Sequence, residues 1–168
     1  MPNGFNSGGG GVSTELHKVI IPPEILKRGF WLYVWVITLR SGRMIHYIGR
    51  TGDSSSPNAQ SPVSRISGHL GPNKHANALQ RHLRTHGIDF ADCERLEFVA
   101  HGPLEEEVEN WDDHMPRRDR THALERDLCM GMKRAGYEVM NDVRCKLLTE
   151  QEAWESVRIA FSERFERL

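Results

Sequence analysis

The first half of the sequence contains side chains of the kinds that act on phosphodiesters. Tyr47 and Gly49 close an apolar run, and Arg65 and His69 follow, four positions apart. On a helix, two residues at this spacing project from the same face, one turn apart. A guanidinium can offset charge on a phosphate, and a phenol or an imidazole can transfer a proton. The same pair is common on a solvated helix face, so the surrounding elements decide between the two interpretations.

A β-hairpin is predicted to carry the tyrosines. Residues 32–39 and 44–51 are rich in β-branched and aromatic side chains, and an Arg-Ser-Gly-Arg stretch separates them. A turn centred at Ser41 sets Tyr33 opposite Gly49 across the ladder. A glycine at this position allows the backbone close approach that a substrate-facing strand end often requires.

The chain after the hairpin is predicted to be mainly helical. Its expected elements are a loop over residues 52–62, helices over 63–70 and 75–86, a third strand over 96–101, a short acidic helix over 104–111, a loop over 112–120 and a helix over 121–134. A last helix begins at a capping box, Thr149-x-x-Glu152, and carries an apolar stripe that is typical of core packing. We therefore expect an α+β fold, with a small antiparallel three-stranded sheet flanked by helices and an additional C-terminal amphipathic helix.

The length and composition are those of one ordinary globular domain. The chain has 168 residues, of which 38% are hydrophobic and 27% are charged. We expect a flexible glycine-rich tail over residues 1–14, the main domain over 15–148 and a helix packed on it within 149–168. There is no apolar run of membrane-spanning length and no signal-peptide layout. Three widely spaced cysteines argue against a disulfide framework, so we expect a reduced, cytoplasmic protein.

Charge is strongly segregated along the chain. Residues 25–88 contain nine Lys or Arg and one Asp, a net charge of +8, whereas the whole chain has a net charge of -1. Such asymmetry suits a protein with one face directed at a polyanion. The alternative is a chance distribution of charges that salt bridges balance in the folded protein. The residues predicted to contact nucleic-acid phosphates are Arg50, Lys74, Arg81 and Arg84.

The order of these motifs resembles the GIY-YIG nuclease family over residues 31–141. Tyr47-Ile48-Gly49 matches the second half of the family signature, whereas the first half reads Leu32-Tyr33-Val34. Arg65 and His69 match the arginine and the histidine or tyrosine one turn later. The stretch KHANALQRHLRTHG resembles the helix that commonly follows. Glu125 and Asn141 resemble the metal-binding glutamate and the closing asparagine of the family.

The resemblance implies a metal-dependent DNA endonuclease. Its catalytic residues would be Tyr33, Tyr47, Arg65, His69 and Glu125. Glu125 would hold one Mg²⁺ or Mn²⁺ against the scissile phosphate, and Arg65 would balance charge on the non-bridging oxygens. A tyrosine would be the general base, its pKa lowered by nearby arginines and the metal. His69 would either be the base itself or orient the tyrosine and the water.

Other functions stay open at this level. Without the resemblance, Glu125 is more simply a solvated helical glutamate. The altered first motif is compatible with a non-catalytic nucleic-acid-binding protein on the same fold. An unrelated interaction protein would use its acidic segment, residues 105–113, and the C-terminal helix. DNA is the expected partner, no membrane association is expected, and a homodimer is left open.

Overall fold

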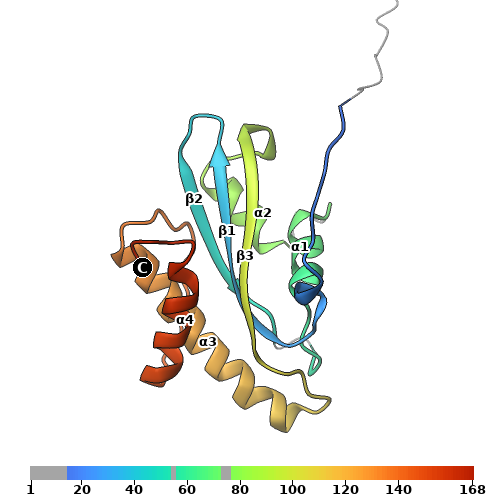
Figure 1. Cartoon of the computed structure of the whole chain (residues 1–168), viewed down its shortest axis with the longest axis vertical. Helices are drawn as coiled ribbons and strands as arrows, with labels where there is room; N and C mark the ends of the chain where they lie inside the picture. Colours follow the sequence, from blue (N-terminus) through green and yellow to red (C-terminus); the bar gives the residue numbers. More distant parts are fainter. Residues whose placement is uncertain (1–14, 54–55, 73–76) are drawn as a thin grey trace, which may run out of the picture.

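A small antiparallel sheet is the centre of this protein. The computed structural model describes residues 15–53, 56–72 and 77–168. Within them the sheet has the strand order β2 (Met44–Arg50), β1 (Phe30–Leu39), β3 (Cys93–Glu105), and four α-helices surround it (Figure 1). The predicted α+β class is therefore confirmed. The tail predicted for residues 1–14 lies outside the described residues.

The elements follow one another as a β-hairpin, two helices, a third strand and two further helices. They are η1 (Pro23–Leu26), β1 (Phe30–Leu39), β2 (Met44–Arg50), α1 (Pro62–Leu70), α2 (Ala78–Thr85), η2 (Phe90–Asp92), β3 (Cys93–Glu105), α3 (Trp111–Arg134) and α4 (Gln151–Ser162), where η marks a 3₁₀ helix.

The β1–β2 hairpin has the predicted register. Its turn contains Gly42 at a φ of +84°, a conformation that glycine adopts without steric cost. The ladder pairs Tyr33 with Gly49 and Trp35 with Tyr47. Because side chains alternate between the two faces of a strand, Tyr33, Trp35 and Tyr47 all lie on one face of the sheet.

Helices cover both faces of the sheet, so the central strand β1 is buried on both sides. Leu32, Val34 and Val36 pack with apolar residues of α3 and α4 on one face. The odd-numbered residues of β1, from Tyr33 to Leu39, pack with α2 on the other face. A strand buried on both faces reads as a continuous apolar run rather than an alternating one, which is the pattern found in β1.

Two predictions for the second half of the chain, one of a helix and one of a loop, were wrong. The acidic helix expected over residues 104–111 is absent from the described chain, because β3 continues to Glu105. The loop expected over residues 112–120 is the first part of α3. The Asn110 side chain accepts a hydrogen bond from the Asp113 N–H at 2.9 Å and so begins this helix. Pro116 lies in the second turn of α3 and has no N–H to donate to the carbonyl of Asp112, four residues earlier. Asp112 is exposed, so water can hydrogen-bond to that carbonyl instead.

The C-terminal helix packs on the domain, but it does not begin with the predicted capping box. Its N-cap is Glu150, which makes no side-chain capping bond. The Thr149 hydroxyl accepts a hydrogen bond from Arg126 at 3.2 Å instead. The predicted apolar stripe packs in the core, where Val157 and Phe161 are each 1% exposed. Within the described residues, no helix is long and apolar enough to cross a membrane.

Candidate active site

The predicted catalytic residues line a single cleft at the end of the β1–β2 hairpin. This cleft has a volume of ≈ 190 Å³. Its walls come from β1, β2, α1, α2, α3 and the loop after β2. The lining residues are Tyr33, Tyr47, Gly49, Arg50, Asp53, Arg65, His69, Ala78 and Glu125. All five side chains predicted to act in catalysis are among them, although they lie far apart in the sequence.

Gly49 allows the Tyr33 ring to lie against the backbone of β2. A Cβ at this position would be 2.4 Å from both Cζ and Oη of Tyr33. No side chain larger than hydrogen is compatible with that approach. The altered first motif thus still presents a tyrosine hydroxyl to the cleft, opposite the glycine of the second motif. The Tyr33 ring is fixed further by stacking on Phe98, with ring centroids 4.9 Å apart.

His69 is buried between the strand residues and the cleft. Its Nδ1 accepts a hydrogen bond from the Trp35 indole N–H at 2.9 Å, and its Nε2 lies 3.4 Å from the Tyr33 hydroxyl. Burial, with a smaller contribution from Arg65, lowers the pKa of His69 to about 4. The imidazole is therefore neutral at physiological pH. Trp35 has no counterpart among the predicted site residues.

Two amides on the second helix fix the end of the helix that carries His69. The Asn77 side chain caps α2 and also donates hydrogen bonds to the carbonyls of Gly68 and His69. Gln80 donates to the carbonyls of His69 and Gly71, at 3.1 and 2.9 Å. Helix carbonyls at a C-terminus have no partner within their own helix, and these contacts satisfy them. The Asn-x-x-Gln pattern was overlooked because the helix was predicted to begin before Asn77.

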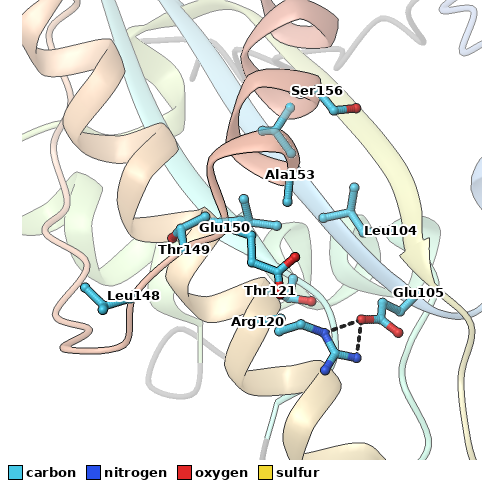
Figure 2. Close-up of a pocket in the computed structure, with 11 residues that line it drawn as sticks. Leu104, Glu105, Arg120, Thr121, Leu148, Thr149, Glu150, Ala153 and Ser156 are labelled. Carbon is cyan, nitrogen blue, oxygen red and sulfur yellow. Dashed lines mark hydrogen bonds and ion pairs between the residues drawn. The ribbon is translucent and has the colours of Figure 1, made fainter.

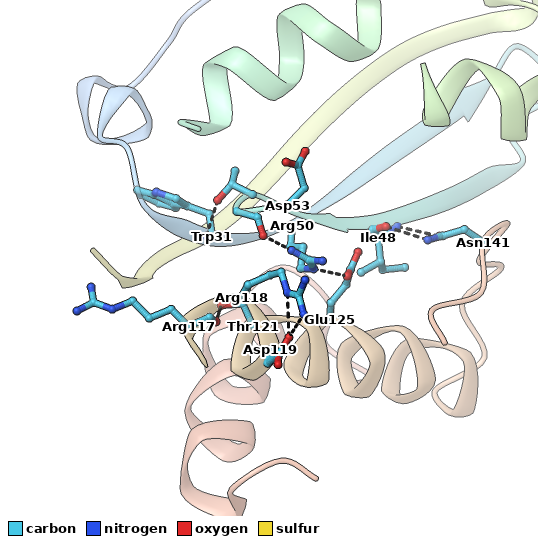
Figure 3. A network of polar contacts seen from close by, with 12 residues as sticks. Trp31, Ile48, Arg50, Asp53, Arg117, Arg118, Asp119, Thr121, Glu125 and Asn141 are labelled. Carbon is cyan, nitrogen blue, oxygen red and sulfur yellow. Dashed lines mark hydrogen bonds and ion pairs between the residues drawn. The ribbon is translucent and has the colours of Figure 1, made fainter. Parts of the chain in front are cut away.

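Glu125 reaches the cleft from α3 and faces Arg50 (Figure 3). Its Oε2 lies 3.0 Å from Nε of Arg50, and the two side chains are only 13% and 15% exposed. Nε of Arg50 is nevertheless a buried donor without an aligned hydrogen bond among the described residues. Burial raises the pKa of Glu125 to about 7, against the opposing influence of Arg50 and Arg65. The carboxylate therefore changes its charge near neutral pH.

Arg65 forms the other ion pair of the cleft. Its Nη2 donates a hydrogen bond to Oδ2 of Asp53 at 2.6 Å, whereas its buried Nε has no hydrogen-bond partner among the described residues. The carbonyl of Asp53 accepts from Nε2 of His114, on α3, at 2.8 Å. The cleft therefore contains two guanidinium groups, each paired with a carboxylate.

The tyrosines do not have the lowered pKa that was expected from nearby arginines. Burial and the charge of Glu125 raise the pKa of Tyr47 to about 12, and Arg65 opposes them only in part. Burial, followed by Tyr47, raises the pKa of Tyr33 well above its ordinary value. The arginines alone do not lower the pKa, because removal of the phenolate from water outweighs the attraction of the guanidinium groups; the lowering expected from the arginines together with a metal ion stays a prediction.

Asn141 supports the site rather than lining it. Its side chain accepts a hydrogen bond from the Ile48 N–H at 3.0 Å and donates to the Ile48 carbonyl at 2.8 Å (Figure 3). One side chain thus continues the sheet at the outer edge of β2. Together with the bridge between His46 and Val139, it ties the chain after α3 to the strand that carries Tyr47 and Gly49.

The predicted phosphate-binding residues separate into different environments. Arg50 lies inside the cleft, where its Nη1 donates to the Gly52 carbonyl. Arg81 and Arg84 are exposed on α2. Lys74 lies outside the described residues.

The donor set fits a lightly held Mg²⁺ or Mn²⁺ ion better than a closed metal cage. Among the described residues there is no group of three or more His, Cys, Asp or Glu side chains placed to hold a metal ion. Mg²⁺ commonly takes one or two carboxylates and keeps several waters or substrate phosphate oxygens. Glu125 offers one carboxylate, with the hydroxyls of Tyr33 and Tyr47 lining the same cleft.

A larger hollow between α3, α4 and the end of β3 has a different character (Figure 2). Its volume is ≈ 330 Å³, and much of its wall is aliphatic, including Leu104, Leu124 and Val157. The charged pair within it, Glu105 and Arg120, is already joined by a hydrogen bond of 2.6 Å. Chemistry is better supported in the smaller cleft, where tyrosine, histidine, arginine and glutamate side chains converge.

Comparisons of the chain with protein-family models, curated proteins and solved structures found no match.

Proposed function

We propose that this protein is a metal-dependent endonuclease of the GIY-YIG type that hydrolyses DNA phosphodiester bonds. The observation that carries the proposal is the convergence of Tyr33, Tyr47, Arg65, His69 and Glu125 on one cleft. These residues come from four different elements. A solvated helix face would leave Arg65 and His69 exposed, but His69 is 7% exposed and the Arg65 side chain is 20% exposed.

The two arginines of the cleft would bind the scissile phosphate. Arg65 is paired with Asp53, and Arg50 is paired with Glu125. A phosphodiester entering between them can exchange the carboxylate contacts of the two guanidinium groups for phosphate contacts. Arg65 would then offset the charge that develops on the non-bridging oxygens, a contact whose loss typically costs about 10²–10³-fold in rate.

Glu125 would hold the divalent ion beside that phosphate. A bound cation supplies Lewis-acid charge at the phosphate and the leaving oxygen. Because the pKa of Glu125 is about 7, its carboxylate must lose a proton near neutral pH before it can act as a ligand. Arg50 must also release the carboxylate oxygen that it now contacts.

In hydrolysis, the oxygen of water forms a bond to phosphorus while the bond to the leaving sugar oxygen breaks. The water gives up a proton, and the leaving oxygen gains one. One of the two tyrosines that line the cleft, Tyr33 or Tyr47, would lose its own proton to solvent and then, as a phenolate, accept the proton from water. A cation held by the Glu125 carboxylate would offset the charge that is the second cause of the high pKa of Tyr47, so that burial, the largest cause, would be opposed by the cation, Arg65 and Arg81.

A plasmid-nicking assay with Mg²⁺ or Mn²⁺ tests the proposal. The wild-type protein should cut, and the Glu125→Ala variant should bind DNA without cutting it. The matched control is Glu166→Ala, which alters an exposed glutamate and should leave cleavage unchanged. A Glu125→Ala protein that cuts at the wild-type rate would remove Glu125 from the mechanism.

One observation favours the alternative of a non-catalytic nucleic-acid-binding protein. The Glu125 carboxylate already has a cationic partner in Arg50, and Tyr47 keeps its proton at neutral pH. The same assay separates the two functions. A wild-type protein that binds DNA with a steep salt dependence, but cuts with neither metal, would be a binding module. A protein without salt-dependent DNA affinity would contradict both proposals.

A further inference from the structure

Trp35 makes an unusual contact for a strand residue beside a catalytic cleft. Its indole Nε1 donates to Nδ1 of His69 at 2.9 Å, and Trp35 itself is 2% exposed. An indole nitrogen can donate a hydrogen bond but cannot accept one. The nitrogen that receives this bond must therefore hold a lone pair and no proton.

This contact determines the proton on the other ring nitrogen. A neutral imidazole carries one proton, so His69 must carry it on Nε2. The alternative tautomer would set the two N–H groups against each other and leave a buried indole N–H without an acceptor. The imidazolium form meets the same obstacle, and burial and Arg65 also disfavour it.

The Nε2–H group of His69 is directed at the Tyr33 hydroxyl. The two atoms are 3.4 Å apart, and the absence of a side chain at Gly49 lets the tyrosine ring lie close to β2. Since Nε2 is a donor, the tyrosine oxygen accepts. Its own proton is then free to point elsewhere, and a phenolate at Tyr33 would be stabilised by the same donor.

We propose that Trp35 is a positioning residue that locks His69 in the Nε2–H tautomer, so that His69 donates to Tyr33 and is not the general base. Both ring nitrogens of His69 are engaged in hydrogen bonds, Nδ1 as an acceptor from Trp35 and Nε2 as a donor to Tyr33, so neither is available to accept a proton from water. The effect of this arrangement on cleavage rests on the proposed endonuclease function, but the tautomer itself does not.

Nitrogen-15 NMR of histidine-labelled wild-type protein tests the tautomer directly. At neutral pH, His69 should show a protonated Nε2 and an unprotonated, hydrogen-bonded Nδ1. In Trp35→Phe, the Nδ1 resonance should move toward that of a nitrogen without a hydrogen bond. Trp31→Phe is the matched control, since it removes another buried indole N–H of β1, which donates to the Lys27 carbonyl, and it should leave His69 unchanged. A protonated Nδ1 in the wild-type protein overturns the proposal.

Substitutions of His69 test its role in cleavage. Glutamine can accept from Trp35 through its oxygen and donate to Tyr33 through its nitrogen, but it cannot act as a base. His69→Ala should lose about 10²-fold or more of the cleavage rate, as expected for loss of a donor at a reacting group. His69→Gln should recover at least about tenfold of that loss. Equal inactivity of the two variants, both folded by circular dichroism, would make His69 the base and contradict the donor role.

The two proposals fail in distinguishable ways. If wild-type protein cuts no DNA with either metal, the endonuclease function fails, while the NMR result still decides the tautomer. If wild-type protein cuts and Nδ1 of His69 is protonated, the role of Trp35 fails and the endonuclease function stands.

Discussion

Replacing Glu125 with glutamine is expected to stabilise the folded protein at high pH, although it removes a residue of the proposed site. Burial raises the pKa of Glu125 from its ordinary value of 4.5 to about 7. The folded protein therefore holds this proton more tightly than the unfolded chain does. As pH rises from 4.5 to about 7, the unfolded chain loses the proton first, so the free energy of unfolding falls through this window. Glutamine has a similar shape and no charge, so the variant avoids this loss.

The size of the effect follows from the same pKa. A change from 4.5 to about 7 corresponds to about 3 kcal/mol, at ~1.36 kcal/mol per pKa unit. The Glu125 side chain is only 13% exposed, so solvent screens little of this. In the variant Arg50 faces a neutral side chain, as it does in the wild-type protein with Glu125 protonated. The two proteins should be about equally stable near pH ~4, and the variant about 3 kcal/mol more stable near pH ~8.

Urea unfolding of both proteins at the two pH values measures this difference. Glu166→Gln, at an exposed position, controls for the general effect of removing a negative charge. A free energy of unfolding of Glu125→Gln that equals that of the wild-type protein near pH ~8, or lies below it, would contradict the expected destabilisation by the buried charge. Either result would mean that the carboxylate is solvated or well compensated in the folded protein.

Added metal extends the test without any activity measurement. A ligand that binds only the folded state stabilises it by about 2.7 kcal/mol at 100 times its dissociation constant. Mg²⁺ or Mn²⁺ should therefore raise the free energy of unfolding of the wild-type protein near pH ~8 but not that of Glu125→Gln. Equal stabilisation of both proteins would exclude Glu125 as the ligand.

Three further variants have outcomes that follow from the geometry. Gly49→Ala forces a methyl group into the Tyr33 ring, so it should lower the free energy of unfolding in urea by about 1–3 kcal/mol and reduce cleavage. An unchanged free energy of unfolding would contradict the close approach of the ring to Gly49. Asn141→Ala leaves the buried N–H and carbonyl of Ile48 without hydrogen-bond partners, so it should lower the free energy of unfolding by about 2–4 kcal/mol in the same assay. A loss below about 1 kcal/mol would mean that water replaces the amide. The double variant Arg81→Ala/Arg84→Ala should weaken DNA binding and reduce the salt-dependence slope by up to about 2; an unchanged slope would exclude α2 from the DNA interface.

Local signals in the sequence predicted the first half of the fold well. The hairpin register follows from two β-rich segments and a short Ser-Gly turn. These segments are adjacent in the sequence, so their pairing depends only on local signals. The second half was less predictable, because residues 104–120 carry conflicting signals. The mixed charges of residues 112–120 were interpreted as a loop. In the structure, the Asn110 cap and the contacts of His114 with the Phe30 and Trp111 rings outweigh the helical hydrogen bond that is lost at Pro116.

The sequence by itself determined which residue types were present, the order of the motifs and the pairing of Tyr33 with Gly49. Only the tertiary structure decided their chemical states. Depth of burial raises the pKa of Tyr47 to about 12 and that of Glu125 to about 7, and Trp35, from a neighbouring strand position, fixes the proton of His69. A pKa or a tautomer depends on solvent exclusion and on partners distant in the chain, and neither can be read from residue spacing.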